Sequence, residues 1–71
     1  MLRTRVKSSG LASIGYDEEH EILEVEFTSG EVYQYLRVPM EVHEALMSAE
    51  SHGTYFSKHI RPFYDFRHIE K

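Results

Sequence analysis

Apolar and polar residues alternate in two stretches of the first half of the chain. Over residues 22–28, Leu23, Val25 and Phe27 alternate with glutamates, which predicts a β-strand with one buried face. A weaker alternation over residues 11–17 predicts a preceding strand of the same kind. A one-residue slip would turn the glutamates toward the core, so we expect a firm register in the second strand.

Residues 28–30 predict a hairpin turn, because Gly30 can adopt the positive φ angle that tight turns require. The chain then returns as a third strand over residues 31–37. A three-residue loop with Gly30 as a bulge places Tyr33 and Tyr35 on the apolar face of the preceding strand. A two-residue loop places them beside its glutamates. We favour the bulged loop, because burying each ring stabilises the fold by roughly 1.5 to 3 kcal/mol relative to exposure.

Helical spacing replaces alternation after the third strand. Pro39 suits the first helical position, where its missing N–H is not needed, and predicts a helix over residues 39–50. A shorter helix is predicted over residues 52–60, with Ser51 as its cap. The apolar stripe expected to bury the first helix consists of Val42, Ala45, Leu46 and Ala49.

These elements predict one α+β domain over residues 1–71, because no repeat, low-complexity tract or linker divides the chain. The expected architecture is a three-stranded antiparallel β-meander packed against one main helix and a second short helix (β-β-β-α-α). Residues 1–10 are expected to form a flexible basic arm. The aromatic residues 63–69 are expected to form an extended tail packed on the body.

The composition adds limits on the class of protein. With 71 residues, the chain has room for one core and little interior for a deep substrate cavity. It contains no cysteine, so it forms neither disulfides nor thiolate metal sites. No stretch approaches the roughly 20 apolar residues of a membrane-spanning helix. We therefore expect a soluble cytoplasmic protein without a membrane partner.

The net charge of −4 is distributed unevenly along the chain. Residues 1–10 carry a charge of +3, and residues 51–71 carry +2. Residues 11–50 carry ten carboxylates against one arginine, a charge of −9. Basic ends flanking an acidic middle would form a positive patch if they met in space, which the sequence leaves open.

Candidate metal-binding and catalytic residues do not form a recognised pattern. His43 and Glu44 begin like a zinc-protease motif, but Met47 stands where its second histidine belongs. Glu24 and Glu26 would need a desolvated environment for acid–base catalysis, which an open strand face does not supply. We expect no metal, no cofactor and no enzymatic activity.

The C-terminal part interleaves aromatic rings with cations, an arrangement that single-stranded RNA binding uses for stacking and for phosphate contacts. The candidate RNA-binding cations are Lys7, Lys58, Arg61 and Arg67, acting with an exposed aromatic side chain of the C-terminal segment. The alternative function is protein–protein interaction or self-association through a sheet edge or through the same aromatic residues.

The order of several short motifs is similar to that of the KTSC domain, over about Val6 to Tyr64. The motifs are Ile14-Gly15-Tyr16-Asp17, Leu23-x-Val25-x-Phe27, Tyr33-Gln34-Tyr35, Val38-Pro39 and Ser51-x-Gly53-x-Tyr55-Phe56. One departure is Ser57, where asparagine would be expected.

The resemblance implies a domain that occurs at the C-terminus of some lysyl-tRNA synthetases and as free-standing bacterial proteins. RNA binding is the function it suggests, and no aminoacylation activity carries over, because no synthetase core is present. The motif residues Tyr33, Tyr35, Ser51, Gly53, Tyr55 and Phe56 are expected to be structural. A small non-catalytic RNA-binding module is therefore the function we expect.

Overall fold

The central strands form where alternation predicts them. The computed structural model describes residues 1 to 69, so the last two residues of the predicted domain lie outside the described range. It contains one five-stranded antiparallel sheet, in which each strand pairs with its neighbours in chain order. The strands are β1 (Arg3–Arg5), β2 (Leu11–Asp17), β3 (Ile22–Phe27), β4 (Val32–Tyr35) and β5 (Phe66–Ile69).

The hairpin between β3 and β4 has the predicted bulged loop. Gly30 adopts a φ of 96°, which favours glycine, and the N–H of Phe27 donates to the carbonyl of Glu31 at 2.8 Å. Tyr33 lies opposite Val25 in the resulting register. The two tyrosines of β4 therefore share the apolar face of β3, as expected. The strand ends earlier than predicted, before Arg37, which adopts a φ of 57°.

The prediction of three strands is wrong, because a short strand is added at each edge of the sheet. Residues 1–10 were expected to be a flexible arm, but Arg3 to Arg5 pair with β2 as strand β1. The expected extended tail pairs with β4 as strand β5. All three residues of β1 and three of the four in β5 are exposed, so neither strand carries the buried stripe that reveals a strand in sequence.

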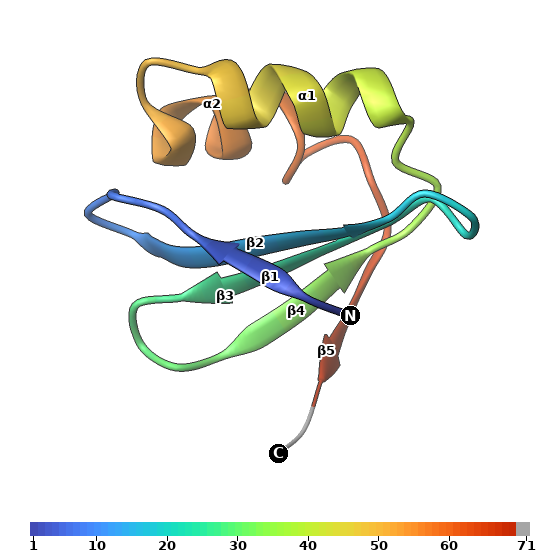
Figure 1. Cartoon of the computed structure of the whole chain (residues 1–71), viewed down its shortest axis with the longest axis horizontal. Coiled ribbons are helices and arrows are strands. Elements are labelled where there is room, and N and C mark those ends of the chain that lie inside the picture. Colours follow the sequence, from blue (N-terminus) through green and yellow to red (C-terminus); the bar gives the residue numbers. More distant parts are fainter. Residues whose placement is uncertain (70–71) are drawn as a thin grey trace.

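Two helices cover one face of the sheet (Figure 1). Helix α1 spans Met40–Ser48, and Pro39 lies at its N-cap with extended geometry rather than at the first helical position. Helix α2 spans His52–His59, as predicted. Its cap is also confirmed, because the Ser51 hydroxyl accepts a hydrogen bond from the backbone N–H of Thr54 at 3.3 Å. Among residues 1 to 69, no helix is long and apolar enough to cross a bilayer.

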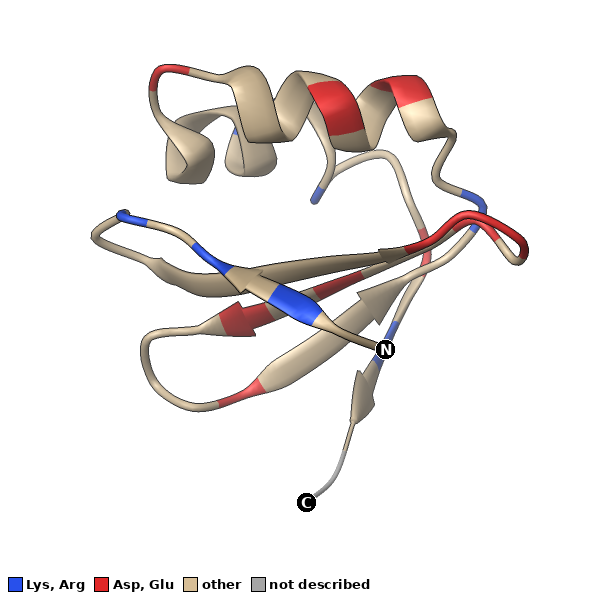
Figure 2. Ribbon diagram, viewed as in Figure 1, with Lys and Arg blue, Asp and Glu red and all other residues tan. Residues whose placement is uncertain are grey.

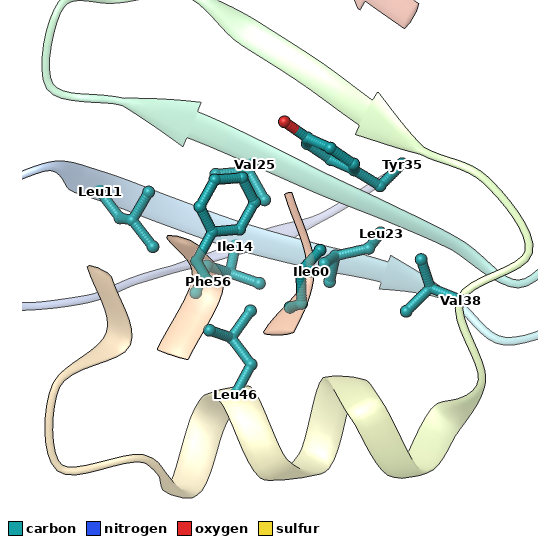
Figure 3. Packing of buried hydrophobic residues seen from close by; sticks show 9 residues of the cluster. All are labelled: Leu11, Ile14, Leu23, Val25, Tyr35, Val38, Leu46, Phe56 and Ile60. Carbon is teal, nitrogen blue, oxygen red and sulfur yellow. The ribbon is translucent and has the colours of Figure 1, made fainter. Parts of the chain in front are cut away.

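The core lies between the helices and the sheet. Figure 3 shows Leu46 of α1 and Phe56 of α2 directed at the strands, and both side chains are almost fully buried. Of the stripe predicted on α1, Leu46 alone is fully buried, while Val42 packs on the core from a half-buried position. The core cluster consists of Leu11, Ile14, Leu23, Val25, Tyr35, Val38, Leu46, Phe56 and Ile60.

Candidate nucleic-acid interface

An open groove of about 540 Å³ lies on the helical face of the sheet, beside the end of α2. Strand alternation and register place four aromatic side chains on this face, from β3, β4 and β5. Two charged side chains also line it. We call this surface the aromatic groove, and its principal residues are Phe27, Tyr33, Tyr35, Phe66, Glu31 and Arg61.

The rings of the aromatic groove contact one another. Tyr33 meets Phe27 edge-on at a centroid distance of 5.5 Å and meets Phe66 at 5.4 Å. Tyr35 is 2% exposed and belongs to the core, whereas Phe66 is 55% exposed. The groove therefore has a rigid aromatic floor and one ring that offers much of its surface to solvent.

Arg61 supplies the positive charge of the groove. It follows α2, and its backbone N–H donates to the carbonyl of Phe56 at 2.9 Å, which fixes where its side chain begins. Its guanidinium carbon lies 5.7 Å from the centroid of the Phe56 ring, a cation–π contact. Burial raises the pKa of the Tyr35 hydroxyl, and the nearby Arg61 guanidinium opposes that rise. The tyrosine hydroxyl therefore stays neutral near pH 7.

Glu31 supplies a negative charge from the β3–β4 hairpin. Its side chain is 56% exposed, and one carboxylate oxygen lies 3.8 Å from Nε2 of His68. The His68 ring stacks on Tyr33 at a centroid distance of 4.7 Å. The groove thus has opposite charges from two different elements, the end of α2 and the hairpin.

The opposite face of the sheet carries a polar network that joins all five strands. Arg3 of β1 donates to the hydroxyl of Ser13 on β2 at 2.9 Å and to the carboxylate of Glu24 on β3. Gln34 of β4 donates to the other oxygen of Glu24 at 2.8 Å, and Arg67 of β5 donates to Gln34 at 2.9 Å. This face is therefore held together by charge-assisted hydrogen bonds rather than by apolar packing.

The expectation that Glu24 and Glu26 lie on an open strand face is wrong for Glu24, which is 7% exposed. Strand β1, which was not predicted from the sequence, places Arg3 over the Glu24 carboxylate and so buries it. Both oxygens of Glu24 are occupied by hydrogen bonds, and Glu26 accepts one from Ser13 at 2.8 Å. Through these hydrogen bonds both carboxylates connect β3 to neighbouring strands.

The four cations proposed from sequence are placed on different parts of the molecule. Arg61 lines the aromatic groove, whereas Arg67 bonds to Gln34 on the opposite face of the sheet. Lys58 lines a separate hollow on α2, and Lys7 is exposed in the loop between β1 and β2. Figure 2 shows the basic segments spread over the strands and the helical layer, while acidic segments gather in the β2–β3 turn and on α1.

Of the six principal residues of the groove, Phe27, Glu31 and Phe66 were not among the site residues named from the sequence. Phe66 belonged to the interleaved C-terminal aromatics, but nothing singled it out. The bulged hairpin register was a signal for Phe27, because it puts this ring on the same face as Tyr33. The interleaved C-terminal pattern named Arg61 together with an exposed aromatic ring, but it did not indicate that Arg61 would meet Phe27 and Glu31.

The motif residues lie in the core, against it, or at the start of α2. Tyr35 and Phe56 are in the core, and Tyr33 and Tyr55 pack against it from half-buried positions. Gly53 lies beside a serine hydroxyl of the β1–β2 loop, 3.4 Å from where a Cβ would stand. Tyr33 and Tyr35 are the motif rings that also line the aromatic groove.

His43, which began the apparent zinc-protease motif, and His52 both have local partners. His43 stacks on Tyr16 at a centroid distance of 4.7 Å, and Nδ1 of His52 lies 2.8 Å from the carbonyl of Leu46. Among residues 1 to 69, no three or more histidine or carboxylate side chains form a group that could hold a metal ion.

Comparison with known proteins places this fold in a family. The KTSC domain model matches residues 7–64. A KTSC domain protein from Yersinia pestis has the same fold, with a TM-score of 0.94, 40% identity and 97% of each chain covered. An uncharacterised protein from Stutzerimonas stutzeri is 50% identical over 62 residues, which is 87% of each chain.

A lysine–tRNA ligase from Nostoc punctiforme contains a similar stretch. It is 35% identical over 63 residues, which cover 89% of this chain and 11% of the ligase. The family model covers most of the chain, and the relatives extend the match to free-standing proteins and to part of a larger enzyme. The chain therefore belongs to the KTSC domain family.

Proposed function

We propose that this chain is a small non-catalytic RNA-binding module, and that unpaired RNA binds in the aromatic groove. The observation that carries the proposal is the combination of an exposed Phe66 ring, the rings beneath it and the Arg61 guanidinium on one open surface. An unpaired base stacks on such a ring, and a guanidinium beside it meets the phosphate. The similar segment within lysine–tRNA ligases, whose name includes an RNA substrate, supports this choice of ligand.

The charge of the protein sets the expected strength of this binding. The net charge of −4 opposes a polyanion, and Arg61 is the cation that lines the groove. Stacking is therefore expected to supply more of the affinity than phosphate contacts do. For single strands, each phosphate contact contributes a slope of about −0.7 to the dependence of log affinity on log salt. We expect a shallow slope and binding that is strongest at low salt.

Fluorescence anisotropy with labelled single-stranded RNA of mixed sequence tests the proposal. Phe66→Ala removes the exposed ring. It is expected to reduce the binding free energy by about 1 to 3 kcal/mol, which is what stacking one base on an aromatic ring contributes. Arg61→Gln is expected to weaken binding and to make the salt slope shallower by about 0.7.

Two exposed residues outside the groove serve as matched controls. Phe63→Ala removes a ring that is 72% exposed, and Arg37→Gln removes a cation of the β4–α1 connection. Both variants are expected to bind RNA like the original chain. A flat titration of the unmodified chain at low salt would remove the proposal, and so would equal losses in the groove variants and their controls.

Self-association is the second candidate, and strand β5 favours it. Among the described strands, β5 ends the sheet and pairs on one side only, and its first residue Phe66 is exposed. An edge strand of this kind can pair with the same strand of a second copy. Sedimentation velocity over a range of protein concentrations tests it. A mass that grows with concentration is expected from self-association, and a constant monomer mass would contradict it.

A further inference from the structure

Glu31 is an unusual residue to find in a groove that meets RNA, because its charge repels phosphate. Its contacts within the described chain are long. One oxygen lies 3.5 Å from the Ser29 hydroxyl and the other lies 3.8 Å from Nε2 of His68. The carboxylate therefore retains the capacity to accept hydrogen bonds from a ligand.

The four RNA bases differ in what they offer a carboxylate on their Watson–Crick edges. Guanine presents two adjacent donors, its ring N1–H and its exocyclic amino group, which match the two carboxylate oxygens. Adenine and cytosine each present an amino group beside a ring nitrogen lone pair, which repels a carboxylate. Uracil presents one ring N–H between two carbonyl oxygens. A carboxylate on the wall of a stacking site therefore selects guanine.

We infer that the aromatic groove prefers an unpaired guanine, with Glu31 as the specificity-determining residue. The inference rests on the proposed RNA-binding function and adds the identity of the base. The guanine stacks on Phe66, its donor edge meets the Glu31 carboxylate, and the adjoining phosphate meets Arg61. Opposite charges line the groove from the hairpin and from the end of α2, and the base edge and the phosphate of one nucleotide need opposite charges of this kind.

Anisotropy titrations with uridine-rich oligonucleotides test the inference, each with one central guanosine, adenosine or inosine. A bidentate contact discriminates by about tenfold or more, so the guanosine oligonucleotide is expected to bind about tenfold more tightly than the adenosine one. Inosine lacks the exocyclic amino group and is expected to fall between them. Free GMP is expected to bind more weakly than the guanosine oligonucleotide, because it lacks the flanking nucleotides.

Glu31→Gln separates the preference from the overall charge effect. A glutamine amide pairs with the adenine edge as well as with guanine, so the guanosine-to-adenosine affinity ratio is expected to fall toward one. Glu19→Gln is the matched control, because it removes the same charge from an exposed position in the β2–β3 turn. It is expected to keep the ratio of the unmodified chain. Both replaced side chains are exposed, so the variants are expected to fold.

The outcomes distinguish the two proposals. Absence of binding to every oligonucleotide would overturn both. Equal affinity for the three oligonucleotides, with binding lost in Phe66→Ala, would overturn guanine selection and leave RNA binding in place. A guanosine preference that persists in Glu31→Gln would overturn the role of Glu31. Free GMP that binds as tightly as the oligonucleotide would overturn RNA as the source of the guanine.

Discussion

Gly15 of β2 lies directly opposite Arg3 of β1, with no room for a side chain between the strands. A Cβ at this position would stand 2.6 Å from the carbonyl oxygen of Leu2 and 2.9 Å from Cγ of Arg3. We predict that Gly15→Ala lowers the free energy of unfolding by about 1 to 3 kcal/mol, because β1 must shift to relieve the overlap. Urea denaturation measures the change.

Gly10→Ala is the control for this substitution. A Cβ at Gly10 would meet nothing within 4 Å, so the free energy of unfolding is expected to stay within about 0.5 kcal/mol of the original. Equal stability in the two variants would contradict the close packing of β1 on β2.

The residues that carry this packing also show a limit of sequence reasoning. Alternation predicted that Gly15 lies in a strand. It did not predict β1, which pairs with β2 at this position. The same is true of Glu24, whose place on the polar side of β3 followed from its sequence neighbours. Its burial follows from Arg3, which lies 21 positions away in the chain. A contact with a distant residue leaves no mark on the local pattern.

Helix α2 depends on its N-terminal cap because it is only eight residues long. Ser51→Ala removes the hydroxyl that accepts from the N–H of Thr54. We predict a loss of about 1 kcal/mol in the free energy of unfolding, measured by urea denaturation. Ser57→Ala, at an exposed position of the same helix, is expected to change stability little. A loss of similar size in both variants would contradict the capping role.

Helix α1 packs on β2 partly through the stacked rings of His43 and Tyr16. Burial lowers the pKa of His43 below its usual 6.5, although nearby Glu44 opposes the shift. Between the two pKa values, the unfolded chain binds a proton at His43 and the folded chain does not. The contribution of His43 to the free energy of unfolding is therefore fully present above about pH 6.5 and is lost as pH falls toward the lowered pKa of the folded state.

His43→Gln is predicted to make this decline shallower. The measurement is the free energy of unfolding in urea at several pH values between about 5 and 7, for the original chain and the variant. Identical slopes for the two proteins would show that His43 does not resist protonation in the folded state.

The elements that sequence patterns predicted are those with a buried stripe. β2, β3, β4 and both helices each bury at least one apolar face against the core, and periodicity reveals such faces. The edge strands β1 and β5 carry arginines and are mostly exposed, as edge strands often are. Their existence depends on pairing with β2 and β4, which no local pattern records.

The two faces of the sheet carry different kinds of side chains. One face carries the core and the aromatic groove, and the other carries the network from Arg3 to Arg67. The sequence predicted cations and aromatic rings in the C-terminal segment, but not which of them would meet. Arg61 and Arg67 are six residues apart in the chain. Arg61 follows α2 and lines the groove, whereas alternation along β5 places Arg67 on the opposite face of the sheet, where it bonds to Gln34.

The central claim is that unpaired RNA binds in the aromatic groove, and amide chemical-shift mapping with single-stranded RNA tests it most directly. We predict that the largest shifts fall on Phe27, Glu31, Tyr33, Arg61 and Phe66, with small changes around Arg3 and Glu24 on the opposite face. Shifts centred on the opposite face, or on Lys7 and Lys58, would contradict the claim, as would a spectrum that RNA leaves unchanged.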